Sequence, residues 1–225
     1  LSFSLNNTSS TVNLDSISKE KSKYKISINI NKTKKFFYSN SFFDNDLKNL
    51  LASIVIISIF KDIHKLDKNI FYDHRAVNGR GDIMKVKLFK KNLYLVDESY
   101  NSNPLSLKSA LKNFDMIKVT NSKKHLVIGD MLELGKYSKK LHVEIAKSIN
   151  KTSLKNINVI GEHAKWIFNN LNKTKKGIVI NKKSQIIDLI KNNLNNNDYL
   201  MIKGSNSTGL NSLTNQIKTG KINAL

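Results

Sequence analysis

Beyond residue 81 the chain alternates short apolar segments with amphipathic segments of about ten residues, and this alternation limits its possible folds more than any other feature. The apolar segments are predicted strands at residues 83–89, 93–96, 125–128, 158–160, 178–180 and 199–202. The amphipathic segments are predicted helices at residues 104–114, 138–149, 162–171, 184–194 and 208–217. Because alternating strands and helices form βαβ units, we predict a Rossmann-like α/β domain over residues 76–225, with a parallel sheet covered by helices on both faces.

Residues 1–75 have a different pattern. The predicted elements are strands at 23–30 and 35–43 and helical stretches at 46–60 and 61–68. Residues 1–16 contain no start signal for a helix or strand, and the chain begins with Leu1 rather than Met. We therefore expect a piece of a longer polypeptide, cut inside a domain.

Local signals refine the region that follows. Gly79 and Gly81 on either side of Arg80 mark a boundary where the backbone turns. Residues 90–92 join the first two predicted strands of the second domain in a hairpin. Asn103 is a predicted N-cap, because Pro follows it at the first helical position, where a missing N–H does no harm.

The composition narrows the classes of function. The chain carries 38 basic and 17 acidic side chains, a net charge of +21, which is typical of nucleic-acid-binding proteins or of proteins with anionic substrates. A Lys-, Asn- and Ile-rich composition from an AT-rich genome is the alternative, and we favour it because the lysines are dispersed and no aromatic residues interleave with them. We expect no nucleic-acid partner. The absence of cysteine excludes a disulfide scaffold, a thiolate metal site and a cysteine nucleophile.

No segment of the sequence indicates a membrane protein. The longest apolar run, residues 50–60, is shorter than the roughly 20 residues that a helix needs to cross a bilayer. No basic-then-apolar leader is present. We expect a cytoplasmic protein that acts as a monomer.

Three polar segments follow predicted parallel strands. They are DESYNSNP at residues 97–104, GDMLELG at 129–135 and KGSNS at 203–207. Ligands of open parallel sheets bind beyond the carboxyl ends of the strands, so these segments together predict one site. The alternative for any single segment is that its polar residues only cap helices and form turns.

The order of these motifs resembles the Mur ligase family. The strings GRG, DESYNSNP, GDMLELG, VIGE and KGS resemble strings in the C-terminal half of those enzymes, and Ser138 and His142 follow Gly135 at the family spacing. The earlier string NDLKNLLAS, residues 45–53, resembles a segment near the end of the family's ATPase domain. The similarity covers residues 35–218 and is greatest to the branch that adds D-alanyl-D-alanine to UDP-N-acetylmuramoyl-tripeptide.

The resemblance implies an organisation and an activity. Residues 1–75 would be the truncated end of a central α/β ATPase domain, and residues 76–225 the complete C-terminal domain. The reaction would be an ATP-dependent amide ligation, in which ATP phosphorylates the tripeptide carboxylate and the amine of D-alanyl-D-alanine attacks the acyl-phosphate.

The resemblance also implies site residues. Arg80 would reach the phosphates of ATP as the catalytic cation. The nucleotide-binding residues would be Asp97, Glu98, Tyr100, Asn101 and Asn103. The dipeptide-binding residues would be Asp130 and Glu133 for its ammonium group and Lys203 and Ser205 for its carboxylate. We expect His142 to have a packing or supporting role, and Trp166 to lie in the core or half-buried.

The sequence departs from the family pattern in ways that matter for activity. Glu98 replaces the second acid of an Asp-Asp pair, Asn45 and Asp46 replace a His-Asn pair, and Asn206 replaces an arginine. No Gly-x-x-x-x-Gly-Lys-Ser/Thr phosphate loop is present. In the family that loop and the Mg²⁺ ligands lie upstream, so we assign no metal ligand here and expect the chain alone to be inactive. Another Mur-type ligase, a basic α/β nucleic-acid-binding module and an inactive gene remnant remain alternatives.

Overall fold

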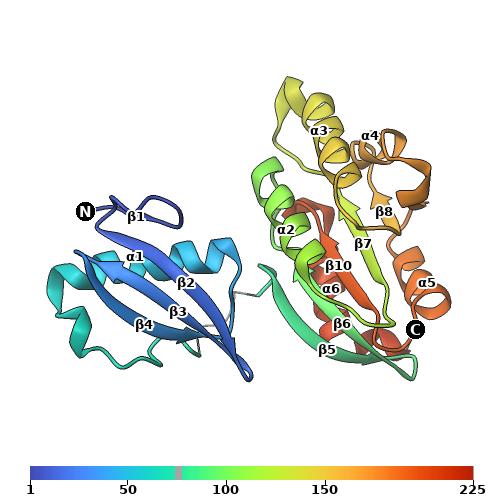
Figure 1. Ribbon diagram of the computed structural model, residues 1–225. Helices are drawn as coiled ribbons and strands as arrows, with labels where there is room; N and C mark the ends of the chain where they lie inside the picture. The colour runs from blue at the N-terminus through green and yellow to red at the C-terminus, as the bar shows by residue number, and fades with distance from the viewer. Residues whose placement is uncertain (74–77, 225) are drawn as a thin grey trace. The chain divides into compact units, whose positions relative to one another are not determined.

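The chain forms two compact units, Leu1–Ala76 and Val77–Leu225. A computed structural model describes residues 1–73 and 78–224, with the side chains of residues 223 and 224 left out. Each unit has its own sheet and its own hydrophobic core (Figure 1).

The first unit is a four-stranded sheet with one helix packed on it. Its strands are β1 (Phe3–Ser4), β2 (Val12–Glu20), β3 (Lys23–Ile30) and β4 (Thr33–Ser39), in that order in the sheet. The strand β1 is parallel to β2, and the other neighbours are antiparallel. Helix α1 (Asp44–Phe60) follows, then the 3₁₀ turn η1 (Ile63–Lys65). Leu51 and Ile54 of α1 are fully buried against Ile26, Ile28 and Phe37 of the sheet.

Two expectations for this unit were wrong in detail. The opening stretch is not irregular, because it contains β1 and the start of β2. The sequence signal of β2 is weak since most of its residues are polar and exposed, and its partner β3 supplies the pairing, Val12 with Ile30 and Leu14 with Ile28. The helical stretch expected at 61–68 is reduced to the turn η1.

The second unit is an α/β domain around a six-stranded sheet, as predicted. Its strands are β5 (Asp82–Leu88), β6 (Lys91–Glu98), β7 (Lys124–Gly129), β8 (Ile157–Ile160), β9 (Lys176–Ile180) and β10 (Tyr199–Lys203). The order in the sheet is β5-β6-β10-β7-β8-β9, and all neighbours are parallel except the hairpin β5–β6. The hairpin turn contains Phe89 and Lys90, both in the left-handed region of φ, which suits a tight turn between twisted strands.

Helices cover both faces of this sheet. They are α2 (Pro104–Met116), α3 (Ser138–Asn150), α4 (Ala164–Asn169), α5 (Ser184–Asn193) and α6 (Leu210–Lys218). Buried residues of α2, α3 and α4 share one core, and those of α5 and α6 share the other. Helix α4 is shorter than expected and α6 begins later, after the 3₁₀ turn η4 (Asn206–Thr208). No helix among the described residues is long and apolar enough to span a bilayer.

The position of β10 decides where a site can form. Although β10 is the last strand in the sequence, it lies between β6 and β7 (Figure 1). Lys203 at its end pairs with Glu98 on one side and with Ile128 on the other. The three polar segments that follow β6, β7 and β10 therefore leave neighbouring strands at the same edge of the sheet.

Candidate functional site

Ser205 joins the three polar segments. Its backbone N–H donates to the Asp130 carbonyl (2.9 Å), and its Oγ accepts a hydrogen bond from the Leu132 N–H (2.8 Å). The same hydroxyl donates to the Ser102 carbonyl (3.2 Å). Because Ser205 is buried, these bonds are shielded from water and hold the three loops in one arrangement.

Lys203 makes a second link, between β10 and the loop after β6. Its Nζ lies 3.2 Å from Glu98 Oε2 and donates to the Asn101 carbonyl (3.0 Å). The side chain is only 2% exposed, and burial lowers the pKa of this ammonium group, whereas the Glu98 carboxylate acts in the opposite direction. The structure thus places Lys203 below the surface of the site, and its contact with a dipeptide carboxylate stays a prediction.

The Gly79–Gly81 turn packs against the end of β6. The Gly81 N–H donates to the Asp97 carbonyl (2.8 Å), and the Tyr100 N–H donates to the Gly79 carbonyl (3.1 Å). Both glycines have positive φ, and a Cβ on Gly79 would lie 2.9 Å from Tyr100 Cβ. Glycine is required here because the backbone both turns and approaches its neighbour closely.

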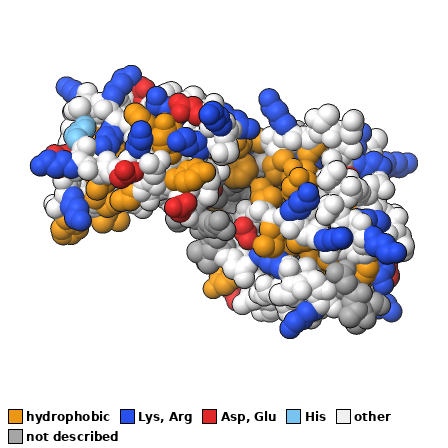
Figure 2. All heavy atoms as spheres, turned by 90° about the horizontal axis from the view of Figure 1, so that it is seen from below, with side chains coloured by type: hydrophobic (Ala, Val, Ile, Leu, Met, Phe, Trp, Pro, Cys, Tyr) orange, Lys and Arg blue, Asp and Glu red, His pale blue; other side chains and the backbone are white. Residues whose placement is uncertain are grey.

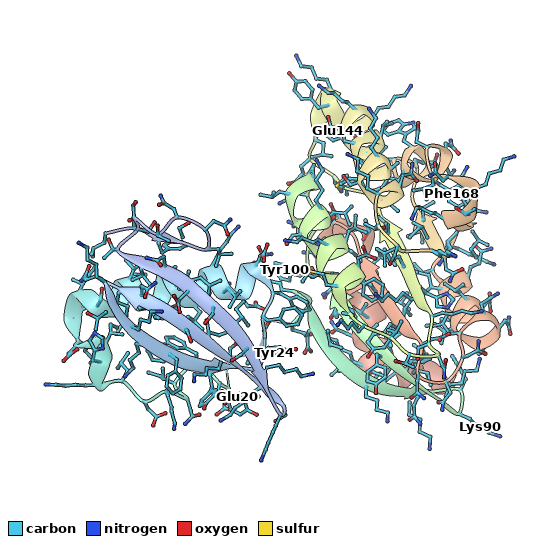
Figure 3. All side chains as sticks on the ribbon, in the orientation of Figure 1. Glu20, Tyr24, Lys90, Tyr100, Glu144 and Phe168 are labelled. Carbon is cyan, nitrogen blue, oxygen red and sulfur yellow. The ribbon has the colours of Figure 1, made fainter. Side chains whose placement is uncertain are left out.

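The turn presents Arg80 at the surface. The Arg80 side chain is exposed, and its guanidinium carbon lies 4.7 Å from the centroid of the Tyr100 ring. Tyr100 is 44% exposed and lies just beyond the end of β6 (Figure 3). A guanidinium over an aromatic ring can still donate its N–H groups to an anion, because the attraction to the ring does not use them as hydrogen-bond donors.

Two predicted nucleotide contacts have partners within the protein. Asp97 is fully buried, and its Oδ1 accepts hydrogen bonds from the N–H and the hydroxyl of Ser99 (3.0 and 2.6 Å). Asn103 is the N-cap of α2, as predicted: its Oδ1 accepts from the Ser106 N–H (2.8 Å), and Ser106 Oγ accepts from the Asn103 N–H (3.1 Å). Their contacts with a nucleotide stay predictions, as does that of Asn101, which is exposed.

The loop after β7 holds the two predicted ammonium-binding carboxylates in different surroundings. Asp130 is half-buried, and its Oδ1 accepts from the Ala164 N–H at the start of α4 (2.7 Å). A Cβ on Gly161 would lie 2.4 Å from the Asp130 carboxyl carbon, so glycine makes this approach possible. Glu133 is exposed and has a φ of 63°, a left-handed conformation that non-glycine residues rarely adopt. Glu133 is thus the more accessible of the two carboxylates.

A histidine supports this loop from below. His142 on α3 is fully buried, and its Nε2 accepts a hydrogen bond from the Met131 N–H (3.2 Å). Its Nδ1 lies 2.8 Å from the Ser138 carbonyl, so one neutral tautomer satisfies both contacts. Burial lowers the pKa of His142 and favours that neutral form. The supporting role expected for His142 agrees with these contacts.

The sequence reasoning missed His163. Its ring stacks on Trp166 with centroids 5.0 Å apart, and its Nδ1 lies 3.1 Å from Ser138 Oγ. Trp166 is half-buried, in keeping with the expectation for it. The signal in the sequence was the i, i+3 spacing of the two rings on a predicted helix. The contact of His163 with Ser138, which is distant in sequence, links the start of α4 to α3.

The distribution of charged side chains points to neither a basic binding surface nor a metal cluster among the described residues. On the face drawn in Figure 2, basic side chains are dispersed among apolar and neutral ones. Among residues 1–73 and 78–224, no group of three or more His, Asp and Glu side chains is placed to hold a metal ion.

Comparisons with known proteins place this domain in a family. A family model described as the glutamate ligase domain of Mur ligases matches residues 79–206, more than half of the chain. The UDP-N-acetylmuramoyl-tripeptide–D-alanyl-D-alanine ligase of Rickettsia prowazekii is 28% identical over 185 residues, which cover 78% of this chain and 39% of that protein. The ligase of the same name from Buchnera aphidicola is 33% identical over 133 residues, 54% of this chain and 26% of that protein.

A solved structure agrees with the fold. The MurF ligase from Thermotoga maritima, in complex with ADP, superposes with a TM-score of 0.77 at 17% identity, covering 97% of this chain and 48% of that one. The fold and the three converging loops define an α/β domain with a candidate ligand site at the carboxyl edge of its sheet. The chain belongs to the Mur ligase family. It spans less than half the length of the relatives it matches.

Proposed function

We propose that the chain is the C-terminal part of an ATP-dependent ligase that adds D-alanyl-D-alanine to UDP-N-acetylmuramoyl-tripeptide through an acyl-phosphate, in the synthesis of peptidoglycan precursors in the cytoplasm. The observation that carries the proposal is the convergence of the segments after β6, β7 and β10, which Ser205 ties together at one sheet edge. The named relatives from Rickettsia and Buchnera support this choice of substrates.

In this proposal Arg80 stabilises charge on the transferring phosphoryl group. Phosphoryl transfer depends on positioning and charge neutralisation more than on covalent chemistry by the protein. The guanidinium suits this task because it stays charged and offers paired N–H donors to phosphate oxygens. The Arg80 side chain is exposed and its guanidinium lies over the Tyr100 ring, which supports this role.

The loop after β6 forms the proposed nucleotide subsite. Tyr100 offers an exposed ring face, and Asn101 and Asn103 offer amide groups at the same surface. Glu98 is proposed to contact the ribose region, while the buried Asp97 holds this loop in shape through Ser99.

The loops after β7 and β10 form the proposed dipeptide subsite. A zwitterion needs a partner of each sign, because an unpaired charge is costly to remove from water. Glu133 and Asp130 are proposed to bind the ammonium group of D-alanyl-D-alanine. Lys203 and Ser205 are proposed to bind its carboxylate. Both also make buried hydrogen bonds to the loops after β6 and β7.

The first unit, residues 1–75, is proposed to be the end of the central ATPase domain. The phosphate loop and the Mg²⁺ ligands would then belong to residues upstream of it, and no step proposed here involves a metal ligand of this chain. We further propose that the complete enzyme is a monomer.

The experiment that tests this function restores the missing part. The chain is fused to the residues of the Rickettsia relative that precede its matched region, and circular dichroism and ATP binding show that the fusion is folded. We expect ADP release and an amide product, detected by mass spectrometry, that require both UDP-N-acetylmuramoyl-tripeptide and D-alanyl-D-alanine. A folded, ATP-binding fusion that forms no product would contradict the proposal. One that joins single amino acids instead would assign the chain to another Mur-type ligase.

A further inference from the structure

Lys218, in the last turn of α6, contacts both sides of the turn that carries Arg80. Its Nζ lies 2.6 Å from Asp97 Oδ2 and 3.7 Å from Asp82 Oδ2, and it donates a hydrogen bond to Asn78 Oδ1. The Lys218 side chain is 10% exposed and that of Asp97 is fully buried. Asn78 precedes the turn and Asp82 follows it, so one ammonium group holds the two ends of the segment together.

Asp97 connects this ammonium group to the rest of α6. Its other oxygen, Oδ1, accepts from Ser99, and Ser99 Oγ lies 2.7 Å from Thr214 Oγ1 and accepts from Asn211 Nδ2 (3.2 Å). Asn211, Thr214 and Lys218 have the spacing i, i+3, i+7, which places them on one face of the helix. That face of α6 therefore contacts the end of β6 and Ser99, which follows it.

Backbone hydrogen bonds connect these contacts of α6 to the turn that carries Arg80. The carbonyl of Asp97 accepts the Gly81 N–H, and the Gly79 carbonyl accepts the Tyr100 N–H. A Cβ on Gly79 would lie 3.2 Å from Asn211 Nδ2, so the turn also lies against α6. Gly79 and Gly81 are therefore both hydrogen-bonded to the end of β6 and its following loop.

We infer that Lys218 is a positioning residue for Arg80. It neutralises the buried Asp97 carboxylate, and it fixes the Asn78–Asp82 segment so that Arg80 extends over Tyr100. A buried carboxylate that loses its cation is strongly destabilised, so the β6 end and the turn attached to it would rearrange without Lys218. The placement of the turn follows from this chain alone, whereas its importance for phosphate binding rests on the proposed function.

Hydrogen exchange of the 225-residue chain tests the inference without any assay of activity. In Lys218→Met, the amides of Gly81 and Tyr100 should lose protection by on the order of tenfold or more, while amides of β7 and β8 change by less than about twofold. Lys218→Arg should keep the protection, because it retains the cation. Lys147→Met is the matched control, since Lys147 is an exposed lysine in the last turn of α3.

A second variant separates positioning from general stability. Lys218→Met combined with Asp97→Asn removes the unpaired buried charge, so the melting temperature should recover while the exchange at Gly81 and Tyr100 stays fast. Unchanged protection at these two amides in Lys218→Met would overturn the inference. The inference would also be overturned if Lys218→Met lost protection equally throughout the second unit and the double variant restored it completely, including at Gly81 and Tyr100. Lys218 would then serve only overall stability.

The fusion enzyme connects the inference to catalysis. Lys218→Met should raise the KM for ATP and lower kcat together with the loss of order at Arg80, whereas Lys147→Met should change neither. If the fusion proves inactive, the proposed function fails, but the exchange experiment still decides whether Lys218 positions the turn.

Discussion

Replacing Ser205 with alanine tests whether the three loops depend on one buried hydroxyl. The Ser205 Oγ makes two hydrogen bonds, to the Leu132 N–H and the Ser102 carbonyl, and the residue is 5% exposed. A typical hydrogen bond contributes about 1 kcal/mol net, and a buried group left without its partner costs about 1–3 kcal/mol. We therefore expect Ser205→Ala to lower the free energy of unfolding of the second unit by about 2 kcal/mol.

The assay uses the single tryptophan of the chain, Trp166, which lies in the second unit. Urea unfolding followed by its fluorescence reports on that unit alone, and the expected loss corresponds to a fall of about 4–8 °C in melting temperature. Ser207→Ala is the control, because Ser207 belongs to the same loop and is exposed. A change of less than about 0.5 kcal/mol in Ser205→Ala, equal to that of the control, would refute the claim that Ser205 holds the loops together.

Three further predictions concern activity and pH. The 225-residue chain alone should not hydrolyse ATP, because it has no phosphate loop; phosphate release above a buffer blank by the purified chain would contradict this. In the fusion enzyme, Arg80→Ala should reduce kcat by on the order of 10²-fold or more with little change in melting temperature. Arg80→Lys should retain only part of the activity, because a point charge lacks the guanidinium fork. Full activity of the alanine variant would show that Arg80 is only a surface residue. Burial lowers the pKa of His142 and of His125, so both bind protons more readily when unfolded, and the free energy of unfolding should fall as the pH drops below about 6.5; urea midpoints that are constant between pH 7 and 5 would contradict that sign.

The strands and helices of the second unit could be predicted because their residues carry the signal locally. Apolar runs such as residues 125–128 are typical of buried parallel strands, and Asn103 before Pro104 marked the start of α2. The strand β2 was not predicted, because its solvent-facing residues are polar and its stability depends on pairing with β3. Such tertiary stabilisation of a weak local pattern is invisible in a sequence window.

The sequence was enough to predict which loops form the candidate site, but not which of their residues are buried and which are exposed. The sequence predicts that Lys203 and Asp97 follow strands, whereas they lie within the ends of β10 and β6. Their burial depends on β10 lying between β6 and β7, and Asp97 is paired with a cation from α6. The predicted site residues that the structure leaves exposed are Arg80, Tyr100, Asn101, Asn103 and Glu133. The order of strands in the sheet is set by packing over the whole unit, which no single motif encodes.

The excess of lysine has a structural component that composition alone does not reveal. Lys91 Nζ donates to the carbonyls of Lys191 and Leu194 at the end of α5 (2.6 and 2.7 Å). Lys124 Nζ donates to the Asp115 carbonyl near the end of α2 (2.8 Å). A cation at a helix C-terminus satisfies free carbonyls and opposes the helix dipole, so these lysines stabilise the fold and do not indicate an anionic partner.

The role of the carboxyl edge as a ligand site is tested most directly by mapping where ADP binds. The ¹⁵N-labelled 225-residue chain is titrated with ADP up to concentrations on the order of 10 mM, since an incomplete site binds weakly. The amide signals of Arg80 and of residues 99–103 should shift together and saturate, and Tyr100→Ala should weaken that response. Shifts spread over the exposed lysines of α3, abolished by salt and leaving residues 80 and 99–103 unmoved, would contradict the assignment of the site to this edge.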